Sequence, residues 1–138
     1  MTSKITCFED LIIWQKAQDI AVTIYQMVNQ NEFIRKDFSL ADQFKRAVLS
    51  ISDNIAEGFE YNNNPDFHRF LRISKGSCGE IRNKIHFGRR LGFIRDDDAE
   101  RLINDIKLLG GQIGELMKKV RQKIQLAKSP KLRGTRNS

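Results

Sequence analysis

The side chains of this sequence that could do chemistry are mainly cationic, and they gather in two stretches. Between residues 69 and 95 there are eight Lys or Arg against a single acid, Glu80. A second group of eight follows Glu115, after which the sequence has no further acid. Residues 1–117 carry 16 basic and 17 acidic side chains, so the net charge of +7 comes from the C-terminal end. Positive charge segregated in this way indicates a polyanionic partner.

The first group of cations is predicted to form a stripe on a helix. At 100° per residue, five of its members fall within an arc of about 100°, beside or opposite the apolar face. Most charged stripes are only hydrated, but this one has few alternating acids and is rich in Arg, which binds phosphate through two parallel hydrogen bonds. We expect contact with the phosphates of RNA or DNA, without base-specific reading. The predicted nucleic-acid-binding residues are Arg72, Lys75, Arg82, Arg89, Arg90, Lys118, Lys119, Arg121 and Lys123.

The sequence lacks the residue patterns of the common catalytic and metal sites. Neither His68 nor His86 has a Glu three residues before it, as a di-iron site in a helical bundle requires. No Gly-x-Ser-x-Gly elbow is present, and Gly110-Gly111-x-x-Gly114 follows no strand, so it cannot form a phosphate-binding loop. We therefore predict a protein that is not an enzyme and that uses no metal or cofactor.

Four polar residues lie close to apolar helix faces and allow two interpretations. They could form an internal polar network that sets the register of the helices, or Glu57 and Glu80 could act as an acid–base pair. The network is the preferred interpretation, because no nucleophile or metal ligand accompanies the two carboxylates. The residues of the predicted network are Arg46, Asn54, Glu57 and Glu80.

Four segments with helical periodicity must position these side chains. Apolar residues recur at three- and four-residue steps from about residue 8 to 28, from 39 to 58, from 65 to 91 and from 96 to 124. Short connections between such helices predict an all-α fold, an antiparallel up-down-up-down four-helix bundle over residues 1–128. Residues 129–138 have no apolar periodicity and are predicted to be a mobile basic tail.

Local signals predict where the middle two helices begin and end. Ser39, with Asp42 three residues later, is the expected N-cap of the second helix, and Gly58 its expected end. Asn64 is the expected N-cap of the third helix, since the following Pro65 suits the first helical position.

Two further features indicate a cytoplasmic protein that does not enter a membrane. No apolar run approaches the roughly 20 residues of a membrane-spanning helix, and the N-terminal residues lack the apolar stretch of a signal peptide. Cys7 and Cys78 are far apart and form no Cys-x-x-Cys motif, so they are expected to be free thiols.

Several motifs occur in an order that resembles a known family. They are Phe8-x-x-Leu11-x-x-Trp14-x-x-Ala17, Gln43-x-x-Arg46-Ala47-x-x-Ser50-Ile51-x-x-Asn54-Ile55-Ala56-Glu57-Gly58, Gly76-Ser77-x-x-Glu80 and Leu91-Gly92-Phe93-Ile94. Over residues 5–125 the sequence is similar to the four-helix bundle proteins encoded in intervening sequences of bacterial 23S ribosomal RNA genes. The departures at Ile81, Gly88 and Phe93 are conservative.

The resemblance implies a homo-oligomer, a pentamer, without catalytic activity. A related branch serves as the accessory protein of diversity-generating retroelements, where it associates with a reverse transcriptase and nucleic acid. These properties are inherited by analogy and not from the residue pattern.

Two functional hypotheses follow. The first is a non-enzymatic, oligomeric nucleic-acid-binding accessory protein that contacts phosphates through basic helix surfaces. The alternative is a homo-oligomeric protein-interaction scaffold, for example a partner of a reverse transcriptase, that does not bind nucleic acid directly. In that alternative, Ile73 and Phe87 on the third helix are the expected interface residues.

Overall fold

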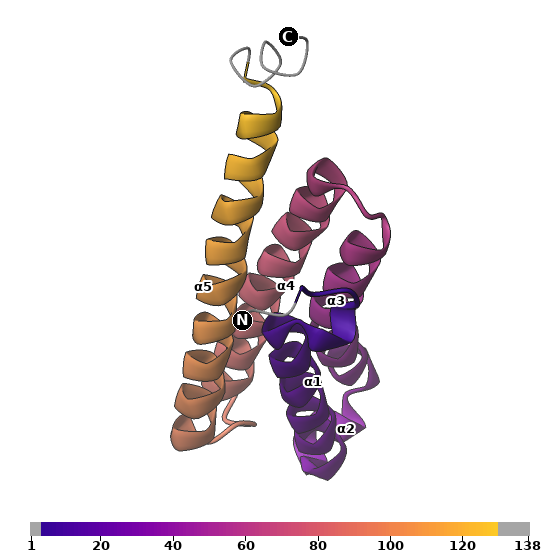
Figure 1. Cartoon of the computed structure of the whole chain (residues 1–138). Helices are drawn as coiled ribbons and strands as arrows, with labels where there is room; N and C mark the ends of the chain where they lie inside the picture. The colour runs from indigo at the N-terminus through magenta and orange to yellow at the C-terminus, as the bar shows by residue number, and fades with distance from the viewer. Residues whose placement is uncertain (1–3, 130–138) are drawn as a thin grey trace, which may run out of the picture.

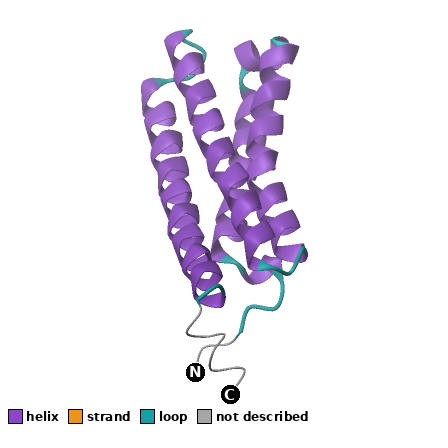
Figure 2. Cartoon of the chain, turned by 90° about the horizontal axis from the view of Figure 1, so that it is seen from above, coloured by secondary structure: helices purple, strands orange, loops and turns teal. Residues whose placement is uncertain are grey.

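The computed structural model of the chain describes residues 4–129, and helices make up most of that part (Figure 1). The four long helices are α1 (Ile12–Gln30), α3 (Phe38–Glu60), α4 (Asn64–Arg90) and α5 (Asp96–Ala127). Two short ones complete the set, η1 (Phe8–Asp10) and α2 (Glu32–Lys36). The described residues contain no strand (Figure 2). The prediction of an all-α fold built on four long helices is confirmed.

The long helices lie side by side, and α4 occupies a central place among them (Figure 1). It packs along α3 on one side and along α5 on the other. Helix α1 packs along α3 but meets α5 over a much shorter stretch. The C-terminal part of α5 extends past the start of α1, so α1 does not cover that part of α5 (Figure 1).

Apolar residues at helical spacing form the core between these helices. Ile24, Phe44, Ile51, Ile81 and Ile106 are all fully buried. Each contributes roughly 1.5–3 kcal/mol through removal of its side chain from water. The same periodicity that predicted the helices also identifies the face that each one buries.

The start of α3 and the connection before it differ from the prediction. Asp37, not Ser39, is the N-cap of α3, because the Asp37 carboxylate accepts a hydrogen bond from the Leu40 backbone N–H at 3.0 Å. The short helix α2 was not predicted. Asn31 ends α1 and also caps α2, since its side-chain oxygen accepts a hydrogen bond from the Ile34 N–H at 3.0 Å.

The turn between α3 and α4 also differs by a few residues. Helix α3 continues past Gly58 to Glu60, and Gly58 is buried against Phe70 of α4 instead of ending the helix. Asn63, not Asn64, caps α4, because the Asn63 side chain accepts a hydrogen bond from the Asp66 N–H at 2.9 Å. The expected role of Gly58 is thus corrected from helix stop to helix contact.

Within the described residues no helix combines the length and the apolar character that crossing a membrane requires. Apart from Ser129, the predicted tail lies outside the residues that the structure describes.

Candidate nucleic-acid interface

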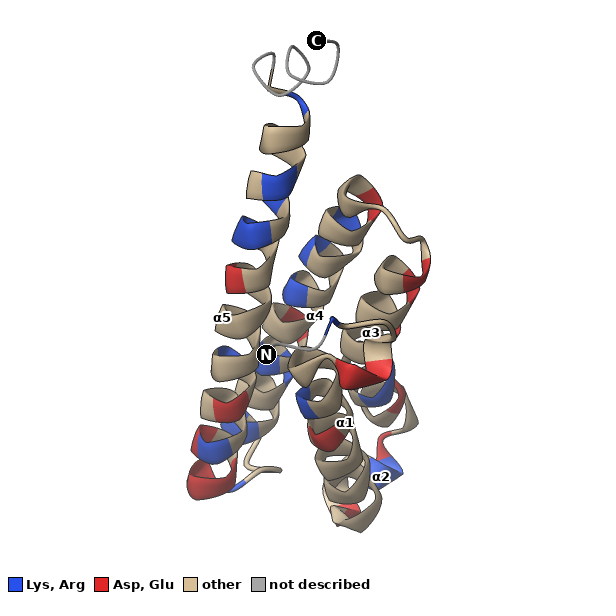
Figure 3. Cartoon of the chain, in the orientation of Figure 1, with Lys and Arg blue, Asp and Glu red and all other residues tan. Residues whose placement is uncertain are grey.

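The five predicted cations of α4 lie beside or opposite the buried face of that helix. Its buried face carries Leu71, Cys78, Ile81 and Ile85. Arg72 and Arg90 lie opposite this face, whereas Lys75, Arg82 and Arg89 lie at its edge; all five are exposed except Arg82, which is half-buried. Blue segments occur along the upper part of α4 and along the upper part of α5 (Figure 3).

The four predicted cations of α5 divide between two sides of the helix. At 100° per residue, Lys118 and Arg121 lie on the same side as Gly114, which contacts α4. Lys119 and Lys123 are turned away from that side, and Lys119 lines a pocket beside α1. All four are exposed. Only two of them can therefore act together with the cations of α4 within one subunit.

The contact between α4 and α5 places Lys75 across Gly114. A Cβ atom built on Gly114 would lie 3.1 Å from Lys75 Cε, so the aliphatic part of this side chain occupies the space that the glycine leaves open. Two turns further along each antiparallel helix, His68 of α4 comes close to Arg121 of α5. The pKa of His68 is lowered by partial burial and then by the positive charges of Arg121 and Arg72.

Few of the nine predicted cations are neutralised within the described part of the chain. Lys118 forms an ion pair with Glu115 at 3.4 Å, and it is the single member of the set that pairs with a carboxylate there. Arg89 contacts the Nδ1 atom of His86 at 3.3 Å. The charge of the other residues remains available to a partner.

The acidic side chains of α5 are most frequent in its first turns, whereas four of its cations lie between Lys118 and Lys123. Asp96, Asp97 and Asp98 occupy the first turn, where negative charge interacts favourably with the helix dipole. Asp98 also pairs with Arg101 at 2.9 Å. Figure 3 shows both red and blue segments in the lower part of α5 and mainly blue ones in its upper part.

The structure does not bring the four residues of the predicted polar network together. Arg46 pairs with Asp42 of its own helix at 2.7 Å, in an exposed position. Glu80 lies 3.7 Å from Lys84, and Glu57 is exposed. Asn54 alone makes part-buried contacts, by donating to the Ser50 carbonyl oxygen at 2.7 Å.

Small hydroxyl groups make the polar contacts between α3 and α4 instead. The Oγ atoms of Ser50 and Ser77 lie 2.8 Å apart, and Ser74 donates to the Ile51 carbonyl oxygen at 2.8 Å. On the other side of α3, Gln18 of α1 donates to Ser52 at 3.1 Å. These hydroxyl contacts were not predicted from the sequence, although small polar residues at core positions of both helices indicated them.

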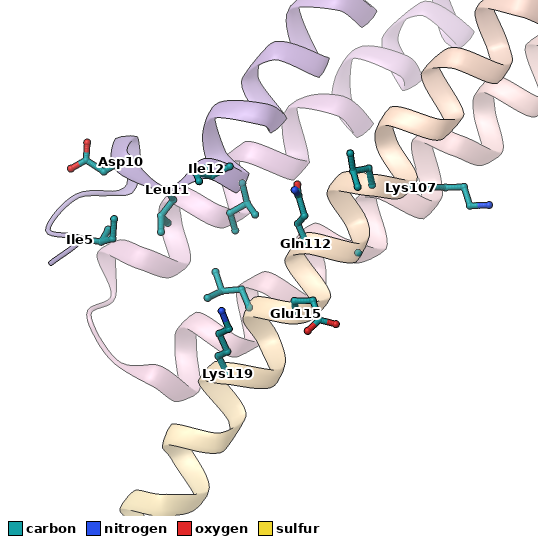
Figure 4. A pocket seen from close by; sticks show the side chains of 12 residues that line it. Ile5, Asp10, Leu11, Ile12, Lys107, Gln112, Glu115 and Lys119 are labelled. Carbon is teal, nitrogen blue, oxygen red and sulfur yellow. The ribbon is translucent and has the colours of Figure 1, made fainter. Parts of the chain in front are cut away.

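An apolar pocket lies between the start of α1 and the middle of α5 (Figure 4). It has a volume of about 780 Å³. Ile12 and Leu108 belong to its lining, yet their side chains are 64% and 61% exposed. Gln112 also lines it, and its Oε1 atom is buried without a hydrogen-bond partner. Unlike the basic surface of α4 and α5, this pocket could pack against another apolar surface.

No group of three potential metal ligands occurs among residues 4–129. Cys7 and Cys78 are both free thiols, as predicted. Burial raises the pKa of Cys78 to about 11.

Comparison with known proteins places the chain in a family. The sequence pattern of the 23S rRNA-intervening sequence protein family matches residues 9–115. The chain belongs to this family. The matched residues of this intervening-sequence protein include α1, α3 and α4 entirely, whereas Lys118 to Lys123 lie beyond them.

A solved structure supports the fold of this family member. It is a protein of unknown function from the S23 ribosomal protein family of Bacteroides thetaiotaomicron, 24% identical in sequence, with a TM-score of 0.69. The alignment covers 78% of this chain and 99% of the other. This likeness shows a shared fold. No curated protein matches the sequence.

Proposed function

We propose that this intervening-sequence family protein is a non-enzymatic, oligomeric accessory protein that binds RNA or DNA through the phosphates. The observation that carries the proposal is the set of exposed cations on α4 and α5 that pair with no carboxylate among the described residues. A cation that is already paired must give up its partner to bind a phosphate, whereas these are free to do so.

The chemistry of the surface favours phosphate contact over base recognition. Arg72, Arg89 and Arg90 each offer a guanidinium group that binds phosphate oxygens in bidentate fashion. In an oligomer, several copies of the same surface would act on one nucleic acid, so a modest contact in each subunit would yield a much higher overall affinity. By family resemblance the expected oligomer is a pentamer.

The test is the salt dependence of binding to a structured RNA. We expect the logarithm of the affinity to fall linearly with the logarithm of salt concentration, with a slope of roughly −0.7 to −0.9 per phosphate neutralised. Replacing Arg89 and Arg90 with Gln should make the slope shallower by about two such increments. Replacing Arg35 and Lys36 with Gln, which removes the same charge from α2, is the control and should change it little. An affinity near physiological salt no better than that of an unrelated protein of the same isoelectric point would refute the proposal.

A second candidate function is a homo-oligomeric interaction scaffold, for example one that binds a reverse transcriptase, without direct nucleic-acid binding. The exposed apolar side chains favour it. Ile73 and Phe87, the interface residues expected from the sequence, are both exposed on α4, and Ile12 and Leu108 are exposed in the pocket beside α1. The unpaired amide oxygen of Gln112 would accept a hydrogen bond from a docked partner.

A further inference from the structure

Helices α4 and α5 meet in a defined register, and the strip of surface along their contact, on the side that carries Lys75 and Arg121, is named the α4/α5 groove. Cys78 lies beside Gly110 and Lys75 lies beside Gly114, so the two helices run antiparallel. A step of seven residues advances a helix by about two turns, or about 10.5 Å, and returns to nearly the same side. One such step from the Lys75–Gly114 contact brings His68 beside Arg121, and one step the other way brings Arg82 beside Lys107.

Basic side chains follow this groove at regular intervals. Arg82 and Lys107 lie at one level, Lys75 crosses Gly114 at the next, and His68 and Arg121 lie at the third. The three levels span about 21 Å along the helices. Lys107 lines the edge of the apolar pocket beside α1, and its side chain extends away from Ile12 and Gln112 (Figure 4). The groove therefore carries basic side chains at three successive levels and not only at one pair of cations.

The neighbouring carboxylates do not cancel this charge. Glu80 is turned towards the α3 side of α4, where Lys84 lies 3.7 Å from it. Glu115 is the nearest acid on α5, and its contact is with Lys118 alone. Among the described residues, Lys75, Arg82, Lys107 and Arg121 form no ion pair.

The groove lacks the side chains that hold unpaired bases. Proteins that bind single strands combine cations with exposed aromatic rings on which the bases stack. The exposed aromatic residues of the described chain lie elsewhere: Phe33 in α2, Phe38 at the start of α3, Tyr61 in the turn before α4, and Phe87 on the side of α4 that faces α3. A surface of this kind matches the phosphate backbone of a duplex, whose bases are already stacked.

We propose that the α4/α5 groove holds one sugar–phosphate strand of a double-stranded nucleic acid, with His68 taking up a proton when the strand binds. This inference rests on the proposed nucleic-acid-binding function and assigns both its site and the class of its ligand. Lys75, Arg82, Lys107 and Arg121 neutralise phosphates along the strand.

The role of His68 follows from the groups that face it. Arg72 lies one turn along α4, and Arg121 faces it from α5; both charges oppose its protonation, as does its partial burial. Asp66 is engaged by Asn63 and Arg69, so it does not offset the two arginines. A phosphate placed between these groups favours the imidazolium form, so binding strengthens as the pH is lowered through the range where histidine titrates.

The experiment measures binding of the full chain to a blunt RNA duplex of about two helical turns, the same DNA duplex, and a single strand of equal length. We expect Lys75→Gln combined with Arg121→Gln to weaken duplex binding about tenfold or more, with a salt slope shallower by about two increments. Lys36→Gln combined with Arg46→Gln removes the same charge from α2 and α3 and should weaken it less than about twofold. The tighter of the RNA and DNA duplexes identifies the source of the strand.

The pH arm uses His68→Gln, with His86→Gln as the control for loss of a histidine. Wild-type affinity for the duplex should rise severalfold between about pH 8 and about pH 6, and His68→Gln should abolish that rise while His86→Gln preserves it.

Each part of the proposal has an outcome that would contradict it. Duplex binding that is unaffected by the Lys75 and Arg121 substitutions would show that the α4/α5 groove is not the binding site, while leaving nucleic-acid binding intact. Equal affinity for the single strand would overturn the duplex assignment, and a pH dependence that survives in His68→Gln would overturn the proton uptake. Absence of any binding by the wild-type protein would instead remove the proposed function itself.

Discussion

Cys78 and Cys7 are the two thiols of the chain, and their surroundings differ strongly. Cys78 lies in the core, where a Cβ atom on Gly110 would be 3.7 Å from its own Cβ atom. Burial raises its pKa to about 11, against the weaker opposing effects of Lys75 and Arg82. Cys7 is partly exposed, and its pKa is also raised, first by a hydrogen bond from its Sγ to Asp10 Oδ2 at 3.2 Å.

We therefore predict that thiol reagents distinguish the two residues. At mildly alkaline pH the folded protein should react at Cys7 only, because a reagent can reach Cys7, whereas Cys78 is buried and its pKa is raised to about 11. Denaturation should release the second thiol. The unfolded Cys78 has the ordinary pKa of 9.0 and loses its proton first, so the free energy of unfolding should decrease as the pH rises from 9.0 towards about 11. Counting modified thiols by mass spectrometry, with Cys7→Ser as the control, checks this; rapid labelling of Cys78 in the folded protein would contradict it.

At the scale of the helices, glycine has opposite roles at two positions. Gly58 of α3 lies against α4 so closely that a Cβ atom there would be 2.5 Å from the Cβ atom of Phe70. Gly76 of α4 has nothing within 4 Å of the corresponding position. The first glycine permits two helices to approach, whereas the second only weakens its own helix.

Replacing each of the two with Ala should therefore have effects of opposite sign. Gly76→Ala should raise the free energy of unfolding by roughly 0.5–1 kcal/mol, through helix propensity alone. Gly58→Ala should lower it by roughly 1–3 kcal/mol, because the backbones of α3 and α4 must separate. Denaturant unfolding followed by circular dichroism measures both. A neutral or stabilising Gly58→Ala would show that α3 and α4 do not meet as described. A destabilising Gly76→Ala would show instead that the outer side of α4 is covered by another subunit.

At the scale of the whole molecule, the contact between α1 and α5 is incomplete. Helix α1 covers only part of α5, and the pocket between them exposes Ile12 and Leu108 beside the buried, unpaired Gln112 oxygen. Apolar side chains in such a pocket favour contact with a second surface. The basic groove runs along the α4 side of α5 and the pocket lies on the α1 side, with Lys107 both in the groove and in the lining of the pocket.

We predict that Leu108→Glu reduces self-association without unfolding the protein. The native mass of the wild-type protein should be that of an oligomer, and Leu108→Glu should shift it towards the monomer, because a charge in the pocket opposes burial against another apolar surface. Phe38→Glu, at a similarly exposed apolar residue at the start of α3, is the control and should leave the mass unchanged. Native mass spectrometry with and without nuclease treatment also reveals bound nucleic acid. A wild-type protein that is a monomer at micromolar concentration would contradict the prediction.

The extent to which the fold was predictable differs between helix interiors and helix ends. The four long helices followed from apolar periodicity, which is a local property of the chain. Their ends depended on single hydrogen bonds, and Asp37 and Asn63 took the capping roles expected of Ser39 and Asn64. Several neighbouring residues can cap equally well, and packing between helices selects among them. Gly58 was mistaken for a helix end for the same reason, since its contact with Phe70 involves a different helix.

The sequence by itself determined that this protein is helical and where along the chain its positive charge lies, because helix periodicity depends on residues close together in the sequence and charge depends on residue type alone. It also determined which side of α4 carries the cations. Only the tertiary structure decided how α4 and α5 align, and hence that Lys75 crosses Gly114 and that His68 faces Arg121. It also decided that Arg46, Glu57 and Glu80 lie apart at the surface. Contacts between helices depend on their relative rotation and displacement, and these are set by how all the buried side chains pack together.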